Sequence, residues 1–114
     1  MVAIIDYGVG NLFAIQNTIR KAGGKSIISA DVKVIDAADK LILPGVGSFS
    51  YAIDELIKRD LLSLLNEQVS KKKKIILGLC LGAQLMTRES EEGNRPGLGW
   101  VDAVTKKFDH QRVS

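Results

Sequence analysis

Three short apolar runs, each ending at a glycine-containing turn that precedes a helix-like segment, constrain the fold of this chain most. The runs cover residues 2–5, 40–43 and 75–79, and the turns cover residues 6–11, 44–48 and 78–82. Strands that alternate with helices form parallel β-α-β units, whose strands are buried on both faces and are therefore apolar throughout. The pattern predicts a doubly wound α/β fold with a mainly parallel sheet, built as a single domain over residues 1–114.

Helix-start residues follow two of these runs. Asn11 can cap a helix that reaches about residue 22, and Ser48 can cap a second helix. The remaining expected elements are a strand over 25–30, a short helix or turn over 31–38, a helix over 60–70, a helix over 81–88, and a strand over 100–108 in an antiparallel arm. The four lysines at 71–74 are interpreted as a solvated helix end, where the helix dipole favours cations. In such a fold, ligands bind at the carboxyl ends of the strands, where the three turns lie.

Glycines flank the single cysteine, Cys80, two residues away on each side, at Gly78 and Gly82. Between an apolar strand and a helix, this pattern predicts a nucleophile elbow with sulfur in place of oxygen, because side chains at the glycine positions would collide with neighbouring elements. The turn presents the thiol at a helix N-terminus, where the dipole favours an anion such as a thiolate. The alternative is a small buried side chain, the usual role of a lone cysteine.

Acyl transfer to a thiolate also needs backbone donors for the oxyanion of the tetrahedral intermediate. The loop at 44–47 ends a neighbouring strand, and its glycines allow the amides of Val46 and Gly47 to turn toward the sulfur. The N–H of Leu81, directly after the cysteine, is the expected further donor. The alternative for this loop is a tight turn without a catalytic part. A histidine base normally partners such a cysteine, but the only histidine, His110, has four residues after it, which favours a surface position.

Composition excludes several classes of function. The net charge is +3, but the lysine run supplies four positive charges and the remainder carries −1, so we expect no nucleic-acid partner. One Trp, two Tyr and three Phe offer no platform for stacking bases. A single cysteine allows neither an intrachain disulfide nor a cysteine cluster for zinc, and we expect no metal or other cofactor. No segment fits a signal peptide or a membrane span, which predicts a cytoplasmic protein without a membrane partner.

Three segments together resemble one family. They are residues 4–12 (I-I-D-Y-G-V-G-N-L), 43–49 (L-P-G-V-G-S-F) and 77–86 (L-G-L-C-L-G-A-Q-L-M). The cysteine segment resembles all class I (triad) glutamine amidotransferases. The other two segments are similar to the glutaminase subunits of imidazole glycerol phosphate synthases, and residues 89–93 and 97–100 continue this similarity. The resemblance covers essentially the whole chain and implies a flavodoxin-like class I amidotransferase fold.

The resemblance also implies roles for individual positions. Cys80 matches the nucleophile that takes the γ-glutamyl group, and Gln84 and Gly45 match residues that bind glutamine. The amides of residues 45–47 match an oxyanion strand whose peptide orientation switches when the substrate of the partner subunit binds. Asn11 matches the edge that faces this partner.

The implied activity is hydrolysis of glutamine to glutamate and ammonia, with delivery of the ammonia to a (β/α)₈ cyclase subunit in a heterodimer of histidine biosynthesis. Family members continue to a P-H-x-G-W segment and to a C-terminal half with an H-x-E pair that completes the triad. Neither motif occurs in these 114 residues, so we expect a truncated chain that is inactive alone and exposes apolar side chains. Two alternatives stay open: an amidotransferase for another acceptor, such as a surface sugar, and a non-catalytic partner-binding fragment.

Overall fold

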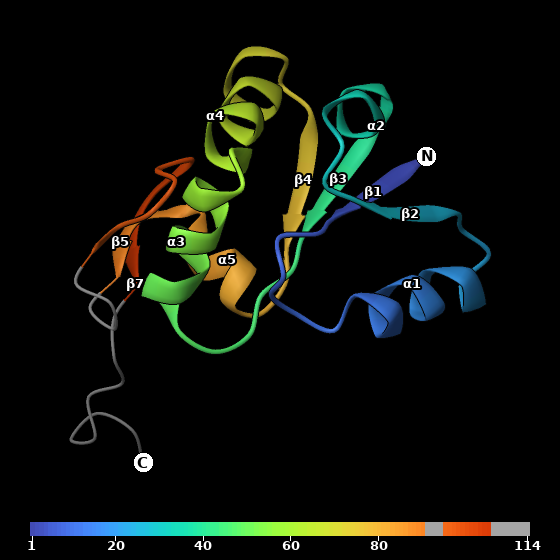
Figure 1. Ribbon diagram of the computed structural model, residues 1–114, viewed down its shortest axis with the longest axis horizontal. Coiled ribbons are helices and arrows are strands. Elements are labelled where there is room, and N and C mark those ends of the chain that lie inside the picture. The colour runs from blue at the N-terminus through green and yellow to red at the C-terminus, as the bar shows by residue number, and fades with distance from the viewer. Residues whose placement is uncertain (91–94, 106–114) are drawn as a thin grey trace.

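A four-stranded parallel sheet flanked by helices organises the chain (Figure 1). This computed structural model describes residues 1–90 and 95–105. The elements, in chain order, are β1 (Val2–Ile5), α1 (Leu12–Lys21), β2 (Ser26–Ser29), α2 (Val32–Ala37), β3 (Lys40–Leu43), α3 (Phe49–Lys58), α4 (Leu61–Asn66), the π-helical segment η1 (Glu67–Lys71), β4 (Ile75–Gly78), α5 (Leu81–Leu85), β5 (Thr87–Ser90), β6 (Arg95–Pro96) and β7 (Val101–Thr105). Within the described ranges, no helix is both long and apolar enough to span a membrane.

The strand order β2-β1-β3-β4 confirms the predicted doubly wound parallel sheet. The chain moves from β1 to β2 in one direction and then returns past β1 to β3. Figure 1 shows α1 on one side of the sheet, with α3 and α4 on the other. The order therefore reverses between β1 and β3, and in open α/β sheets the crevice at such a switch point is where ligands bind.

The core lies on the face of the sheet that α2, α3, α4 and α5 cover. The sheet contributes Ala3 and Ile5 from β1, and Leu41 and Leu43 from β3. Buried side chains of the helices pack on them: Ile35, Phe49, Ala52, Ile53, Leu56, Leu61, Leu64, Leu65, Leu81 and Leu85. Burial stabilises the fold by about 1.5–3 kcal/mol for each large apolar side chain, so this cluster dominates the stability of the sheet.

The opposite face of the sheet is covered less completely. Ile4 and Ile42 are buried there, but the helix on this side, α1, has no fully buried residue. On β4, the edge strand of the sheet among the described residues, Ile75 and Leu77 are 65% and 54% exposed. The prediction that this apolar run is buried on both faces is therefore wrong for the described residues. The expected exposure of apolar side chains is confirmed.

The local signals for helix starts are confirmed. The Asn11 side chain accepts a hydrogen bond from the Ala14 N–H at 3.3 Å, and the Ser48 hydroxyl oxygen accepts one from the Tyr51 N–H at 3.3 Å. Each cap satisfies a backbone donor that the first turn of the helix leaves without a partner.

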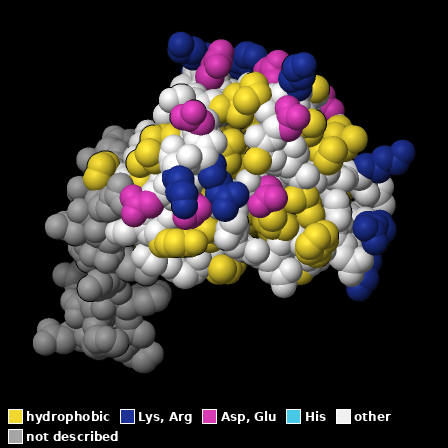
Figure 2. Space-filling view, viewed as in Figure 1, with side chains coloured by type: hydrophobic (Ala, Val, Ile, Leu, Met, Phe, Trp, Pro, Cys, Tyr) yellow, Lys and Arg dark blue, Asp and Glu magenta, His cyan; other side chains and the backbone are white. Residues whose placement is uncertain are grey.

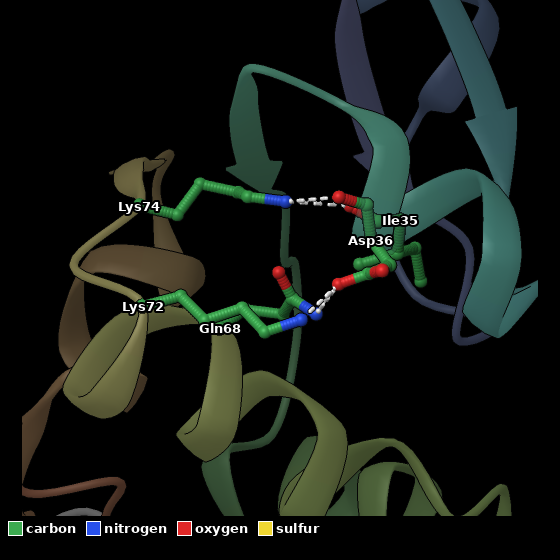
Figure 3. Close-up of polar contacts among 5 residues, drawn as sticks. All are labelled: Ile35, Asp36, Gln68, Lys72 and Lys74. Atoms are coloured by element: carbon green, nitrogen blue, oxygen red, sulfur yellow. Dashed lines mark hydrogen bonds and ion pairs between the residues drawn. The ribbon is translucent and has the colours of Figure 1, made fainter.

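The lysine run is less solvated than its position after a helix predicts. Lys74 is half-buried, and its ammonium donates to the carbonyls of Ile35 and Asp36, at 2.9 and 2.8 Å. Lys72 forms an ion pair with the Asp36 carboxylate, which also accepts a hydrogen bond from the buried Gln68 amide (Figure 3). Two of the four lysines thus bind the C-terminal end of α2, where the helix dipole favours cations.

A second, three-stranded sheet replaces part of a predicted helix. Helix α5 ends at Leu85, not at residue 88, because the Leu98 N–H donates to the Leu85 carbonyl at 2.7 Å and the Val101 N–H to the Met86 carbonyl at 2.9 Å. In this sheet β5 pairs antiparallel with β6 but parallel with β7, so the expected antiparallel arrangement of the last strand is wrong. Residues 106–108 of the predicted strand lie outside the described residues.

Candidate active site

Cys80 lies at the tip of the turn between β4 and α5 and is exposed. Its backbone angles are φ 54° and ψ −122°, a combination that a residue with a Cβ adopts only under strain. Such strain persists where the surrounding structure enforces it, and it clusters at functional sites.

The two glycines of the motif are required by close packing. A Cβ added at Gly82 would lie 1.9 Å from the Leu43 carbonyl oxygen, and one added at Gly78 would lie 2.7 Å from the Cα of Ala83. Both contacts are with backbone atoms, which cannot move aside without displacing β3 or α5. The structure therefore forms the turn that the sequence predicts, with α5 packed against the end of β3.

The β3–α3 loop lies directly beside this turn. A Cβ added at Gly45 would lie 2.8 Å from the Gly82 nitrogen, and the Gly45 carbonyl accepts a hydrogen bond from the Leu81 N–H at 3.3 Å. The expected oxyanion donor Leu81 is thus engaged by the loop itself. Val46 is exposed, and Gly47 has a φ of 85° with open space around it.

A pocket of about 250 Å³ joins these segments at the carboxyl edge of the sheet. It lies at the switch point between β1 and β3, where the fold predicts ligand binding. Its lining consists of Gly10, Asn11, Ala14, Ile15, Pro44, Gly45, Val46, Leu79 and Cys80. The three turns singled out in the sequence therefore meet around the thiol.

Of the other predicted site residues, Asn11 lines the pocket and Gln84 does not. Asn11 lines the pocket while its side-chain oxygen caps α1. Gln84, on α5, is half-buried and does not line the pocket; its side-chain oxygen is buried with no hydrogen-bond partner among the described residues. His110 lies outside the described residues. Within the described part of the chain, no group of three or more His, Cys, Asp or Glu side chains could hold a metal ion.

Sequence reasoning missed Tyr7. This side chain is fully buried, and its hydroxyl donates to the Pro44 carbonyl at the base of the loop. Burial raises the pKa of the Tyr7 hydroxyl well above its ordinary value, so the group remains a protonated donor across the physiological range. The signal was a tyrosine directly after a buried strand in the D-Y-G segment, but nothing local identifies a partner 37 residues away.

Comparison with known proteins identifies the family. The protein family described as "Glutamine amidotransferase class-I" matches residues 3–113 of this chain. The chain belongs to the class I glutamine amidotransferase family. This confirms the resemblance that the cysteine segment carries. Among solved structures of similar fold, a glutamine amidotransferase has a TM-score of 0.78 at 17% identity, covering 93% of this chain and 56% of that one. A putative peptidase E from Listeria monocytogenes has a TM-score of 0.69 at 15% identity, covering 89% and 62%.

Two curated relatives of this amidotransferase chain carry a more specific name, "Imidazole glycerol phosphate synthase subunit HisH 2". The relative from Methanococcus maripaludis is 49% identical over 108 residues, which are 95% of this chain and 54% of the relative. The relative from Pseudomonas aeruginosa is 43% identical over 111 residues, 97% of this chain and 55% of the relative. The chain thus spans about half the length of the curated relatives it matches.

Proposed function

We propose that this chain is the cysteine-bearing part of a glutaminase subunit that hydrolyses glutamine and delivers ammonia to the cyclase subunit of an imidazole glycerol phosphate synthase. The observation that carries the proposal is the exposed Cys80 thiol, on a strained turn beside the backbone amides of the β3–α3 loop. The names of relatives at 43% and 49% identity support the ammonia acceptor. The protein would act in the cytoplasm, as a heterodimer with a (β/α)₈ cyclase in histidine biosynthesis.

Nucleophilic catalysis by the thiol accounts for the proposed reaction. The Cys80 thiolate attacks the carboxamide carbon of glutamine and forms a tetrahedral intermediate with a negatively charged oxygen. Collapse of this intermediate breaks the C–N bond, and the nitrogen leaves as ammonia after accepting a proton. Water then hydrolyses the γ-glutamyl thioester to glutamate and restores the thiol. The base for these proton transfers would be the family's H-x-E pair, which residues 1–114 do not contain.

The loop geometry supports a switchable oxyanion site. The Leu81 N–H donates to the Gly45 carbonyl, so this donor is not available to an oxyanion. Rotation of the peptide between Gly45 and Val46 would withdraw that carbonyl and turn the Val46 N–H toward the same position. A single rotation, about ψ of Gly45 and φ of Val46, would therefore release one donor and add another. Because loss of one oxyanion donor costs about 10²–10³ in kcat, the described conformation corresponds to a slow state.

Glutamine would occupy the pocket beside the thiol. The pocket has a volume of about 250 Å³, and Gly45 forms part of its wall. Gln84 would reach this glutamine only after its side chain turns out from α5, because its side-chain oxygen is buried and does not line the pocket.

An exposed apolar surface next to the pocket supports docking of the cyclase. Phe13 and Val46 are 77% and 57% exposed, and together with Asn11 they line a second, shallower hollow of about 480 Å³. Hydrophobic side chains gather at the start of α1 (Figure 2). A partner bound there would cover the mouth of the cysteine pocket and receive ammonia before it reaches solvent.

The test uses the complete protein with and without the cyclase. We expect the Cys80→Ala variant to release no ammonia from glutamine and to form no γ-glutamyl thioester in mass spectra. Tyr51→Phe, a change at an exposed tyrosine, should behave as the parent. Turnover that survives in Cys80→Ala would refute the nucleophile. Ammonia released by the parent but never incorporated by the cyclase would refute the acceptor alone.

A further inference from the structure

The base of the loop at 44–47 is fixed on several sides. The Tyr7 hydroxyl donates to the Pro44 carbonyl from within the core, where Tyr7 has no exposed surface. The pyrrolidine ring fixes φ of Pro44. On the other side, a Cβ at Gly10 would lie 3.0 Å from the Cβ of Pro44, so the β1–α1 loop packs against the proline. Neither the carbonyl nor the ring of Pro44 is therefore free to turn.

The loop becomes less constrained after Gly45, where a Cβ would lie 2.8 Å from the Gly82 nitrogen. The Gly45 carbonyl is held by one hydrogen bond of 3.3 Å, from the Leu81 N–H at the elbow. Val46 is 57% exposed, and a Cβ at Gly47 would meet no atom within 4 Å. The boundary between the fixed and the free part of the loop thus lies at the peptide between Gly45 and Val46.

The Tyr7 hydrogen bond decides where this boundary falls. If the Pro44 carbonyl had no partner, the peptide between Pro44 and Gly45 could also rotate, and the Gly45 carbonyl would leave Leu81 by displacement of the whole loop. The Val46 N–H would then not arrive at the position that the Gly45 carbonyl vacates. With the carbonyl of Pro44 anchored, rotation of the following peptide exchanges these two groups at one place.

We propose that Tyr7 is a positioning residue of the glutaminase reaction, whose hydroxyl anchors the Pro44 carbonyl and so confines the rotation that forms the oxyanion site to the Gly45–Val46 peptide. The inference rests on the proposed function, since the rotation matters for catalysis only if Cys80 forms an acyl intermediate. Tyr7 does not contact the reacting atoms; it acts through Pro44.

Amide hydrogen exchange tests the anchor without relying on activity. In the complete protein, Tyr7→Phe removes the hydroxyl and keeps the ring. We expect the Leu81 amide to exchange about tenfold faster in this variant, because the Gly45 carbonyl is held less firmly. The Leu79 amide, which donates to Leu43 ahead of the anchored residue at 3.0 Å, should be unchanged. Equal protection of Leu81 in Tyr7→Phe and the parent would overturn the proposal. Tyr51→Phe is the matched control, since Tyr51 is an exposed tyrosine.

Steady-state kinetics with the cyclase present provide the second readout. We expect Tyr7→Phe to lower kcat for glutamine hydrolysis about 10- to 100-fold with KM unchanged, because the oxyanion donors act on the transition state and not on bound glutamine. A higher KM with unchanged kcat would contradict a role in the oxyanion site. If no variant, parent included, hydrolyses glutamine, the proposed function fails, while the exchange result still decides whether Tyr7 anchors the loop.

If the Tyr7→Phe variant does not fold, a measurement on the unmodified protein tests the same anchor. The anchored hydroxyl proton should give a slowly exchanging NMR resonance with a cross-peak to the Gly45 amide. A Tyr7 hydroxyl that exchanges as fast as that of exposed Tyr51 would overturn the anchor.

Discussion

The strained backbone at the nucleophile predicts that the cysteine destabilises the protein. At φ 54° and ψ −122°, Cys80 stores about 1–3 kcal/mol relative to a residue without a Cβ. Replacement by glycine removes this strain, whereas replacement by alanine keeps it. Glycine in turn costs about 0.5–1 kcal/mol through the larger freedom of the unfolded chain. We therefore expect Cys80→Gly to be more stable than Cys80→Ala by about 1 kcal/mol.

The comparison isolates the backbone because the thiol is exposed, so both variants lose little packing. Urea unfolding at pH 7, followed by circular dichroism, gives the free energies. A difference of about 1 kcal/mol corresponds to a shift in Tm of about 4 °C for a domain of this size. Both variants should lack glutaminase activity. A Cys80→Gly protein no more stable than Cys80→Ala would refute the conclusion that the turn strains its central residue.

Three further predictions concern packing, acid stability and docking. Gly82→Ala should destabilise the protein by about 3 kcal/mol or more in urea unfolding, because the added Cβ would lie 1.9 Å from a backbone carbonyl of β3. The pKa of the Asp36 carboxyl is held below its ordinary value by hydrogen bonds from Gln68 and Lys72, so its stabilising effect is present above the unfolded pKa of about 3.9 and is lost as the pH falls through the folded value. The unfolding free energy of Asp36→Asn should therefore fall less steeply than that of the parent below about pH 4. Phe13→Asp should raise the Kd for the cyclase about 10- to 100-fold in titration calorimetry, the equivalent of burying one aromatic side chain.

Each of these three predictions has a control variant or an outcome that would contradict it. Gly47→Ala meets open space and should cost only about 1 kcal/mol through its positive φ; an equal loss for Gly82→Ala would contradict the steric argument. If the unfolding free energy of Asp36→Asn falls with pH as steeply as that of the parent, the Asp36 carboxylate does not contribute to acid stability. Ile57→Asp changes an exposed apolar residue of α3 outside the hollow, and an effect on the Kd as large as that of Phe13→Asp would show that docking is not local.

Features encoded within a few residues could be predicted from the sequence. The caps at Asn11 and Ser48 and the strand bounds of β3 follow from side-chain chemistry next to each element. The turn at Cys80 was predictable for the same reason, since the glycines that permit it lie two residues away. The meeting of three turns followed from the parallel topology, which brings the carboxyl ends of strands to one edge.

Features that depend on distant segments could not be predicted. The end of α5 at Leu85 depends on hydrogen bonds from residues 98 and 101, which replace the next turn of helix. The apolar sequence of β4 indicated a strand, but not that β4 lies at an edge of the sheet that the described residues form, and so not that Leu77 is exposed. The partner of Tyr7 is likewise set by the packing of β1 beside β3 and not by any local pattern.

The lysines before β4 have a consequence for folding kinetics. Parallel pairing joins β1 to β3 and β3 to β4, whose first residues are 38 and 35 positions apart, and such non-local sheets form slowly. While the sheet assembles, β4 is an unpaired apolar segment able to join the same segment of another chain. Lys71 and Lys73 remain exposed beside it even in the folded structure. Basic side chains gather at the upper edge in Figure 2, the edge at which α4 lies in Figure 1. The charges of the two lysines repel a second copy, so the run acts as a gatekeeper against intermolecular strand pairing during synthesis.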